Sequence, residues 1–206
     1  MVIVSLFKLS HNELSGIFTI TSSEIICCPL CNGELSYRDS RLRTLKDFIG
    51  EHCRFFLRRL RCPKCEKLHT ELPSIIQPYR HYCSDAIQSV LDGNEAGCGA
   101  DNSTIRRWKT EFATAESDIN QRLAAVYTQM TDATVPIETP SKIFSVIKAT
   151  CKHWLAFVMT LLINSGHKIC TRFAFCPSFV PDTFNSAGKN AVEGSKKDDK
   201  AIENSS

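Results

Sequence analysis

The sequence predicts an α+β protein with a small N-terminal β zinc ribbon, a helix-turn-helix-like region, C-terminal helices and a disordered tail. Two brackets of the form Cys-Pro-x-Cys, Cys28–Cys31 and Cys62–Cys65, flank a basic, aromatic segment that favours strands. Apolar residues recur at helical spacing from Ser84 onward. The last segment is polar and charged, as disordered tails are. We place the domain boundaries at 1–83, 84–115, 116–187 and 188–206.

The two cysteine brackets predict a closed metal site. A spacing of two residues lets both thiolates of a bracket face one ion from a tight turn, with backbone N–H groups free to bond the sulfurs. Gly33 follows the first bracket, where such a turn needs a residue that tolerates positive φ. His69 could be an alternative ligand or a donor to a ligand, although a histidine in such a position more often simply packs, and Cys27 could replace its neighbour Cys28. The predicted ligands of a tetrahedral Zn²⁺ are Cys28, Cys31, Cys62 and Cys65.

The other cysteines have no regular spacing, so we expect them to be small buried residues. The chain has 11 cysteines in all. Its first residues, Met1–Lys8, lack the basic start and the cleavage site of a secretory signal. We therefore expect a cytoplasmic protein whose thiols bind metal and do not form disulfides.

Charge is concentrated between the brackets. The formal net charge of the chain is only +3, but ten basic residues and five acidic residues lie between Glu34 and Lys67. A basic ribbon suits a phosphate backbone, although a solvated basic face is an ordinary surface feature. Arg58 and Arg59 in this segment are candidate DNA contacts.

The first third of the chain should consist mainly of strands. Loose alternation of apolar residues over 2–25 favours one or two strands leading to the first bracket. His52–Arg61 has no helix breaker and runs into the second bracket, which indicates the returning ribbon strand. Leu72–Pro73 and Gln77–Tyr79 predict a linker that leaves the metal site.

Two helices are expected next. Ser84 and Asp85 can cap a helix that ends before Gly93, and a glycine-containing turn follows. A second helix then begins with Asn102 or Ser103 as its N-cap and runs to Phe112. Its apolar residues share one face, while its cations lie largely off that face.

This second helix has the composition of a recognition helix, in which an apolar seam docks the helix and polar residues face the major groove. Hydroxyls near its N-terminus could contact phosphate, and its arginines could read guanine edges. The alternative is an ordinary amphipathic helix with a solvated basic face. The candidate DNA contacts in it are Ser103, Thr104, Arg106, Arg107 and Lys109.

Further helices are predicted over 116–130 and 141–163, separated by prolines. The most apolar run, Trp154–Ile163, covers ten residues, whereas a membrane span needs about 20. We therefore expect a core or dimer helix and no membrane association. The segment 169–179 is apolar again and is read as a strand or a helix.

Together these motifs resemble the bacterial family catalogued as domain of unknown function 6431, common in Firmicutes. Its members are similar to the zinc-ribbon and helix-turn-helix heads of insertion-sequence transposases. The resemblance implies DNA binding linked to mobile elements. The motifs that carry it are the brackets, Arg58–Cys65, His69 with Leu72–Pro73, Pro78–Tyr82 and Ser103–Trp108.

A catalytic nuclease domain is not expected. Transposases of the RNase H type need an αβ domain that gathers three metal-binding carboxylates. About 90 residues follow Phe112, and Asp118, Asp132, Glu138 and Asp182 have no strand-like context. We therefore expect a binding head that is not an enzyme and has no small-molecule substrate.

Two other classes of function use the same four cysteines. A zinc ribbon can bind a protein partner, or mediate a homodimer, in place of DNA. In rubredoxin-like proteins, two such brackets hold iron and transfer one electron. The basic character of this chain favours DNA over the electron carrier.

Overall fold

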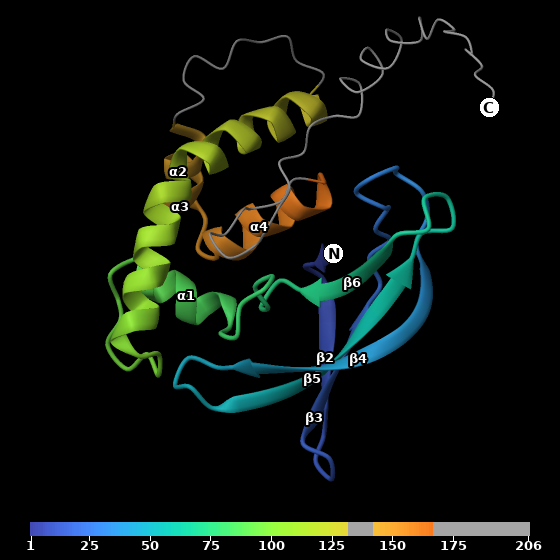
Figure 1. Ribbon diagram of the computed structural model, residues 1–206, viewed down its shortest axis with the longest axis horizontal. Helices are drawn as coiled ribbons and strands as arrows, with labels where there is room; N and C mark the ends of the chain where they lie inside the picture. Colours follow the sequence, from blue (N-terminus) through green and yellow to red (C-terminus); the bar gives the residue numbers. More distant parts are fainter. Residues whose placement is uncertain (132–141, 167–206) are drawn as a thin grey trace, which may run out of the picture. The chain divides into compact units, whose positions relative to one another are not determined.

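The computed structural model describes residues 1–131 and 142–166, which form six strands and four helices (Figure 1). The strands are β1 Val2–Val4, β2 Phe7–Asn12, β3 Ile17–Ser22, β4 Ser36–Lys46, β5 His52–Arg61 and β6 Leu68–Pro73. The helices are α1 Ser84–Leu91, α2 Asn102–Thr131, α3 Ile143–Thr150 and α4 Trp154–Asn164. The predicted segment 169–179 and the predicted tail 188–206 lie outside the described residues.

β5 is the central strand of a curved, mixed sheet (Figure 1). The strand order is β1-β6-β5-β3-β2, and β4 also pairs with β5. Along one edge of β5, β4 runs antiparallel over the whole strand. The other edge is shared, because β3 pairs in parallel with Arg54–Phe56 and β6 pairs antiparallel with Arg59–Arg61. The predicted return strand over His52–Arg61 is therefore confirmed, and three other strands pair with it.

The fold class predicted from the sequence is wrong, first because the sheet is larger than a ribbon. The chain continues beyond the second bracket into β6, which in turn pairs in parallel with β1. Leu72–Pro73, predicted as a linker, forms the end of β6. Leu72 is fully buried, and Pro73 is the last strand residue, a position that proline tolerates. A proline therefore did not mark a linker here.

The fold class is wrong, second, because the described residues contain no helix-turn-helix head. The helices predicted over 102–112 and 116–130 are one helix, α2, of 30 residues. The connecting residues 113–115 are Ala-Thr-Ala, which contain neither glycine nor proline to end a helix. α1 has the predicted extent, but its N-cap is Cys83, whose thiol accepts a hydrogen bond from the Ala86 N–H at 3.4 Å.

The predicted helix over 141–163 is two helices. α3 ends at Thr150, the backbone of Cys151 is extended, and α4 begins at Trp154. The ring of Phe144 in α3 packs edge-on against the indole of Trp154, with 5.3 Å between centroids. No helix in the described ranges combines the length and the apolar character that crossing a membrane requires.

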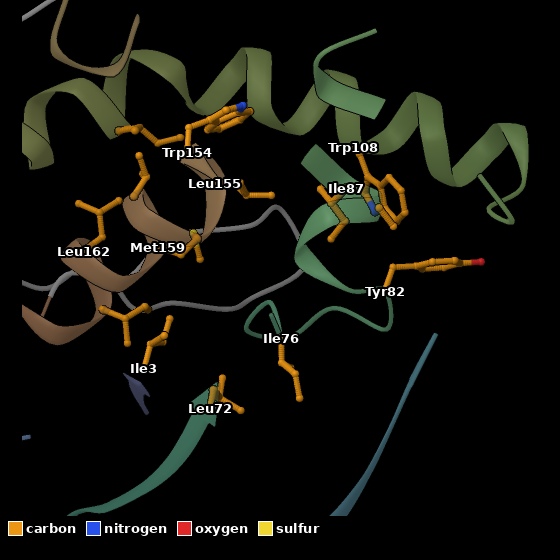
Figure 2. Close-up of a cluster of buried hydrophobic side chains, with 14 of the residues drawn as sticks. Ile3, Leu72, Ile76, Tyr82, Ile87, Trp108, Trp154, Leu155, Met159 and Leu162 are labelled. Atoms are coloured by element: carbon orange, nitrogen blue, oxygen red, sulfur yellow. The ribbon is translucent and has the colours of Figure 1, made fainter. Parts of the chain in front are cut away.

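One hydrophobic core joins the sheet to the helices (Figure 2). Ile3 of β1 and Leu72 of β6 are buried together with Ile87, Trp108 and Leu155 of the helices. The Asn164 side chain at the end of α4 accepts from the Ile3 N–H and donates to the Ile3 carbonyl, both at 2.8 Å. The cysteine-bearing sheet thus shares its interior with residues more than 150 positions away.

Candidate metal centre and basic surface

The four bracket cysteines meet at one point. Their sulfur atoms all lie within 4.8 Å of one another. The Sγ–Sγ distance is 3.6 Å between Cys28 and Cys65 and 3.4 Å between Cys31 and Cys62. A tetrahedral ion with Zn–S bonds of about 2.3 Å separates its sulfurs by about 3.8 Å. These four thiols, none of them in a disulfide, therefore form a metal-binding site whose size is consistent with zinc.

The two brackets fold into matching turns. In the first turn the Cys28 N–H donates to the Gly33 carbonyl at 2.7 Å, and in the second the Cys62 N–H donates to the Lys67 carbonyl at 2.9 Å. The residue after the second cysteine of each bracket has a left-handed backbone, with φ of 56° at Asn32 and 59° at Glu66. The same local geometry is thus built twice, and each copy presents two sulfurs to the shared point.

Gly33 does not have the positive φ predicted for it, because Asn32 takes that conformation. Asparagine visits the left-handed region more readily than most residues. Gly33 has a different function: a Cβ added there would lie 3.1 Å from the Cys62 sulfur and 3.1 Å from the Lys64 Cβ. Its missing side chain lets the two turns approach each other.

Backbone amides and neighbouring thiols set the protonation of the cluster. The Gly33 N–H lowers the pKa of Cys31, but burial and the three other thiols raise that pKa to about 12. The Cys65 N–H, with help from Lys64, lowers the pKa of Cys62 to about 7 against the effect of burial. Cys62 is therefore easier to ionise than Cys31, and a divalent ion would supply the charge that favours the thiolate form of its ligands.

His69 lies beside the cluster and is not one of its four members. Its Nε2 is 3.3 Å from the Cys28 sulfur, and its side chain is buried. Burial lowers the pKa of His69, so the neutral ring can donate its Nε2 proton to a thiolate. Cys27, the other alternative ligand, is exposed and outside the cluster. Of the three roles considered for His69, namely ligand, donor to a ligand and packing residue, the structure thus favours the donor.

The first turn also contacts the end of α4, which the sequence did not indicate. A Cβ added to Gly166 would lie 2.5 Å from the Pro29 carbonyl oxygen, so only glycine fits there without a shift. Gly166 has a φ of 82° and follows the last residues of α4. The sequence signal at Gly166 is that of a helix end, which says nothing of a contact with Pro29.

The basic candidates fall into two groups. Arg58 and Arg59, the sheet arginines, are both engaged by acids from adjacent strands. Arg58 donates to the buried Glu71 at 2.5 and 2.6 Å, and Arg59 donates to both oxygens of Asp39 at 2.5 Å. Lys109 on α2 likewise pairs with Glu95 at 2.8 Å.

Arg106 and Arg107, the α2 arginines, are exposed and form no ion pair within the part of the chain that the structure describes. Asp101, which the sequence analysis did not identify as the cap, lies at the start of the same helix. It accepts from the Thr104 N–H at 2.8 Å and from the hydroxyls of Ser103 and Thr104 at 2.5 and 2.9 Å. These bonds hold the pKa of Asp101 well below its usual range. The Ser103 and Thr104 hydroxyls are therefore committed to a capping carboxylate.

Asp101 could have been identified from the sequence. Aspartate is as good an N-cap residue as asparagine, and it stands directly before the predicted start of the helix. The acids Glu71, Asp39 and Glu95 offered no comparable signal, since their partners lie on other elements. Asp132, Glu138 and Asp182 lie outside the described residues.

The comparison with protein families agrees with the motifs. Residues 28–108 match the family described as Domain of unknown function (DUF6431). No curated protein and no solved structure matches the chain. The match begins at the first metal-binding cysteine and ends at Trp108 in α2, so it contains the whole cysteine cluster. The resemblance to the domain of unknown function 6431 family that was inferred from the sequence is confirmed over residues 28–108.

Proposed function

We propose that this protein binds Zn²⁺ as a structural ion and binds DNA through the α2 arginines. The proposal rests on a contrast between two sites: one is fully occupied by protein groups, and the other carries positive charges that have no acidic partner. The metal site is filled by four protein thiols, and Arg106 and Arg107 are cations with no acidic partner among the described residues. The first feature supports a scaffold and the second supports a contact with an anion.

The closed site supports a structural role over catalysis, and the basic charge of the segment between the brackets is the reason to propose zinc and not an iron electron carrier. Four thiolates leave no coordination position for water or substrate, so the centre would act as a brace and not as a catalyst. A closed site of this kind contributes free energy to folding. We therefore propose a binding protein that is not an enzyme and works in the bacterial cytoplasm, in a role related to mobile DNA.

Metal analysis tests the first part of the proposal. Elemental analysis of the purified chain should give one zinc per chain, whereas one iron would support the electron carrier. Cys62→Ser should abolish metal binding and unfold the sheet, because structural zinc in small domains supplies about 10 kcal/mol or more. Cys53→Ser is the matched control, because Cys53 lies on β5, the strand that leads into Cys62, and is not a member of the cluster. A Cys62→Ser protein that stays folded without metal would refute the structural role.

Salt-dependent binding to duplex DNA tests the second part. Changing Arg106 and Arg107 together to Ala should reduce the slope of log affinity against log salt by about 2, about 1 for each lost phosphate contact. Arg38 and Arg41 on β4 are also exposed, and their double Ala variant is the matched control. If the two double variants lose the same amount of DNA affinity, the sheet also contacts DNA. If neither variant loses affinity, DNA binding through the α2 arginines is refuted.

A protein-interaction module is the second candidate, supported by one exposed apolar pair. Leu42 and Phe56 lie opposite each other on β4 and β5 and are 43% and 41% exposed. Such a pair could dock a partner or a second copy of the chain. Phe56→Ser should then weaken self-association in sedimentation measurements, and its DNA affinity should equal that of the parent.

A further inference from the structure

A groove runs along the first turns of α2 beside the loop that precedes the helix. Its volume is about 490 Å³. Ala100 and Ile105 form an apolar part of its lining, while Asn102 and Thr110 add hydrogen-bonding groups. The cations Arg106 and Lys109 complete the lining on the helix side. The groove therefore combines apolar surface, amide and hydroxyl groups, and two positive charges.

The charges of the groove favour an anion. Arg106 has no ion pair in the described part of the chain, and Lys109 pairs with the single acid of the lining, Glu95. Both members of that pair are nearly half exposed, at 46% and 45%. An exposed ion pair of this kind contributes little to stability, so a stronger anion can replace the carboxylate at low cost. Asp101 is not part of the lining, since its oxygens face Ser103 and Thr104.

The wall opposite the helix is held in place by the turn between β4 and β5. The Gly99 N–H donates to the Phe48 carbonyl at 2.8 Å. A Cβ added to Gly99 would lie 2.0 Å from the Ile49 carbonyl oxygen, so the loop can approach this turn only with glycine there. The Tyr82 hydroxyl also donates to the Gly99 carbonyl at 3.3 Å. These contacts fix the groove in advance of any ligand, which lowers the ordering cost of binding.

We propose that this groove binds the phosphate of a nucleotide unit, with Arg106 and Lys109 contacting the phosphate and the apolar surface contacting the sugar or base. The proposal deepens the proposed function and rests on it. Guanidinium and ammonium groups form charge-assisted hydrogen bonds to phosphate oxygens. The phosphate belongs either to a DNA strand or to a free nucleotide, and both sources present the same chemistry. Arg107 does not line the groove, although it adjoins Arg106 in sequence.

The experiment uses the full, metal-loaded chain and four probes: inorganic phosphate, adenosine monophosphate, a single-stranded oligodeoxynucleotide and its duplex. Lys109→Gln removes one of the two groove cations, and Arg41→Gln on β4 is the matched control, because Arg41 is exposed and lies outside the groove. Binding of all nucleotide probes should fall about tenfold in Lys109→Gln and stay unchanged in Arg41→Gln. Arg107→Gln should weaken only the oligonucleotide probes, because Arg107 does not line the groove. Glu95→Gln should strengthen binding of the nucleotide probes, because Lys109 no longer has an acid beside it. Melting temperatures of all these variants should equal that of the parent, since each residue is exposed.

The pattern of losses separates this proposal from the proposed function. If the oligonucleotides alone depend on Lys109, the groove holds a strand phosphate, and both proposals are supported. If only adenosine monophosphate binds, and its binding depends on Lys109, the groove holds a free nucleotide and the proposed DNA binding is refuted. If DNA binding depends on Arg107 and not on Lys109, the groove proposal fails and the proposed function stands. If no probe binds, both fail.

Discussion

Two Arg-Arg pairs stand in this chain, and their surroundings differ. The sheet arginines, Arg58 and Arg59, each face a carboxylate from a neighbouring strand. The α2 arginines, Arg106 and Arg107, face no acid within the described residues. The same dipeptide thus joins strands in one place and leaves two charges open to solvent in the other. Positive charge in the sequence is a weaker indication of anion binding where the fold pairs the cation with a buried acid, as it does Arg58 with Glu71.

The sheet pairs also differ from each other in burial. Glu71 exposes only 4% of its side chain, and Arg58 covers it from a position that is 34% exposed. Arg59 and Asp39 are both about one-third exposed. Glu71 raises the pKa of Arg58 through a two-pronged hydrogen bond. The contrast between the arginine pairs is therefore strongest for Arg58, which we expect to stabilise the sheet and not to contact DNA.

Glu71→Gln should have the largest effect on this contrast. It leaves Arg58 facing a buried amide, and we expect a loss of about 2–3 kcal/mol in unfolding free energy, less than for a fully buried pair because Arg58 reaches solvent. Urea denaturation measures it. Glu66→Gln is the matched control, because Glu66 pairs with Arg61 on the exposed surface. Equal losses in the two variants would show that burial does not distinguish the sheet pairs.

Asp101→Asn tests the α2 side of the comparison through DNA affinity, and we expect its effect to be smaller than that of Glu71→Gln. Asparagine can still accept the Thr104 N–H at the start of α2, but its amide nitrogen cannot accept from the Thr104 hydroxyl, so we expect a small loss of helix stability. The change removes a negative charge close to the α2 arginines, and we expect DNA affinity to rise about threefold at low salt. Filter binding at two salt concentrations measures it. Asp85→Asn in the first turn of α1 is the control. An unchanged affinity for Asp101→Asn would indicate that DNA lies elsewhere.

The metal centre could be predicted from the sequence because its information is local. Two residues between cysteines fix the geometry of each turn, and the four predicted ligands meet as expected. The support around them was predicted only in part. His69, four residues after Cys65, was a candidate donor to a ligand, although the sequence did not show that it reaches Cys28 across 41 positions. The contact of Gly166 with Pro29 spans a still longer separation and leaves no periodic or compositional trace.

The fold was less predictable for the same reason. β5 was recognised from its own residues, whereas the pairing of β6 with β1 joins segments almost 70 positions apart. Pro73 at the end of β6 is accommodated by its place in the sheet, whereas the break predicted between Phe112 and Glu116 had no glycine or proline to support it. The predicted role of the sheet arginines was uncertain for the same reason. Their acidic partners, Glu71 and Asp39, lie on other strands and reach the arginines only when the sheet forms.

Arg59→Ala should have the smallest effect on the contrast. Because its partner Asp39 is exposed to solvent, we expect the melting temperature to change by no more than about 2 °C. The Arg59 guanidinium holds the pKa of Asp39 below its usual range, so this substitution should raise that pKa toward the value of a free aspartate. A titration of the Asp39 carboxyl by NMR follows the change. In the parent protein, the stabilisation from the Arg59–Asp39 pair is present above the pKa of Asp39 in the unfolded state, about 3.9. It is lost as the pH falls toward the lower pKa of Asp39 in the folded state.

The two readouts of Arg59→Ala give different information. A shifted Asp39 pKa with an unchanged melting temperature would mean that the pair exists but contributes little, as expected for an exposed contact. A loss of stability as large as that of Glu71→Gln would mean that both sheet arginines are structural to the same degree. In that case the location of an arginine on the sheet, and not the burial of its partner, would separate the sheet arginines from the α2 arginines.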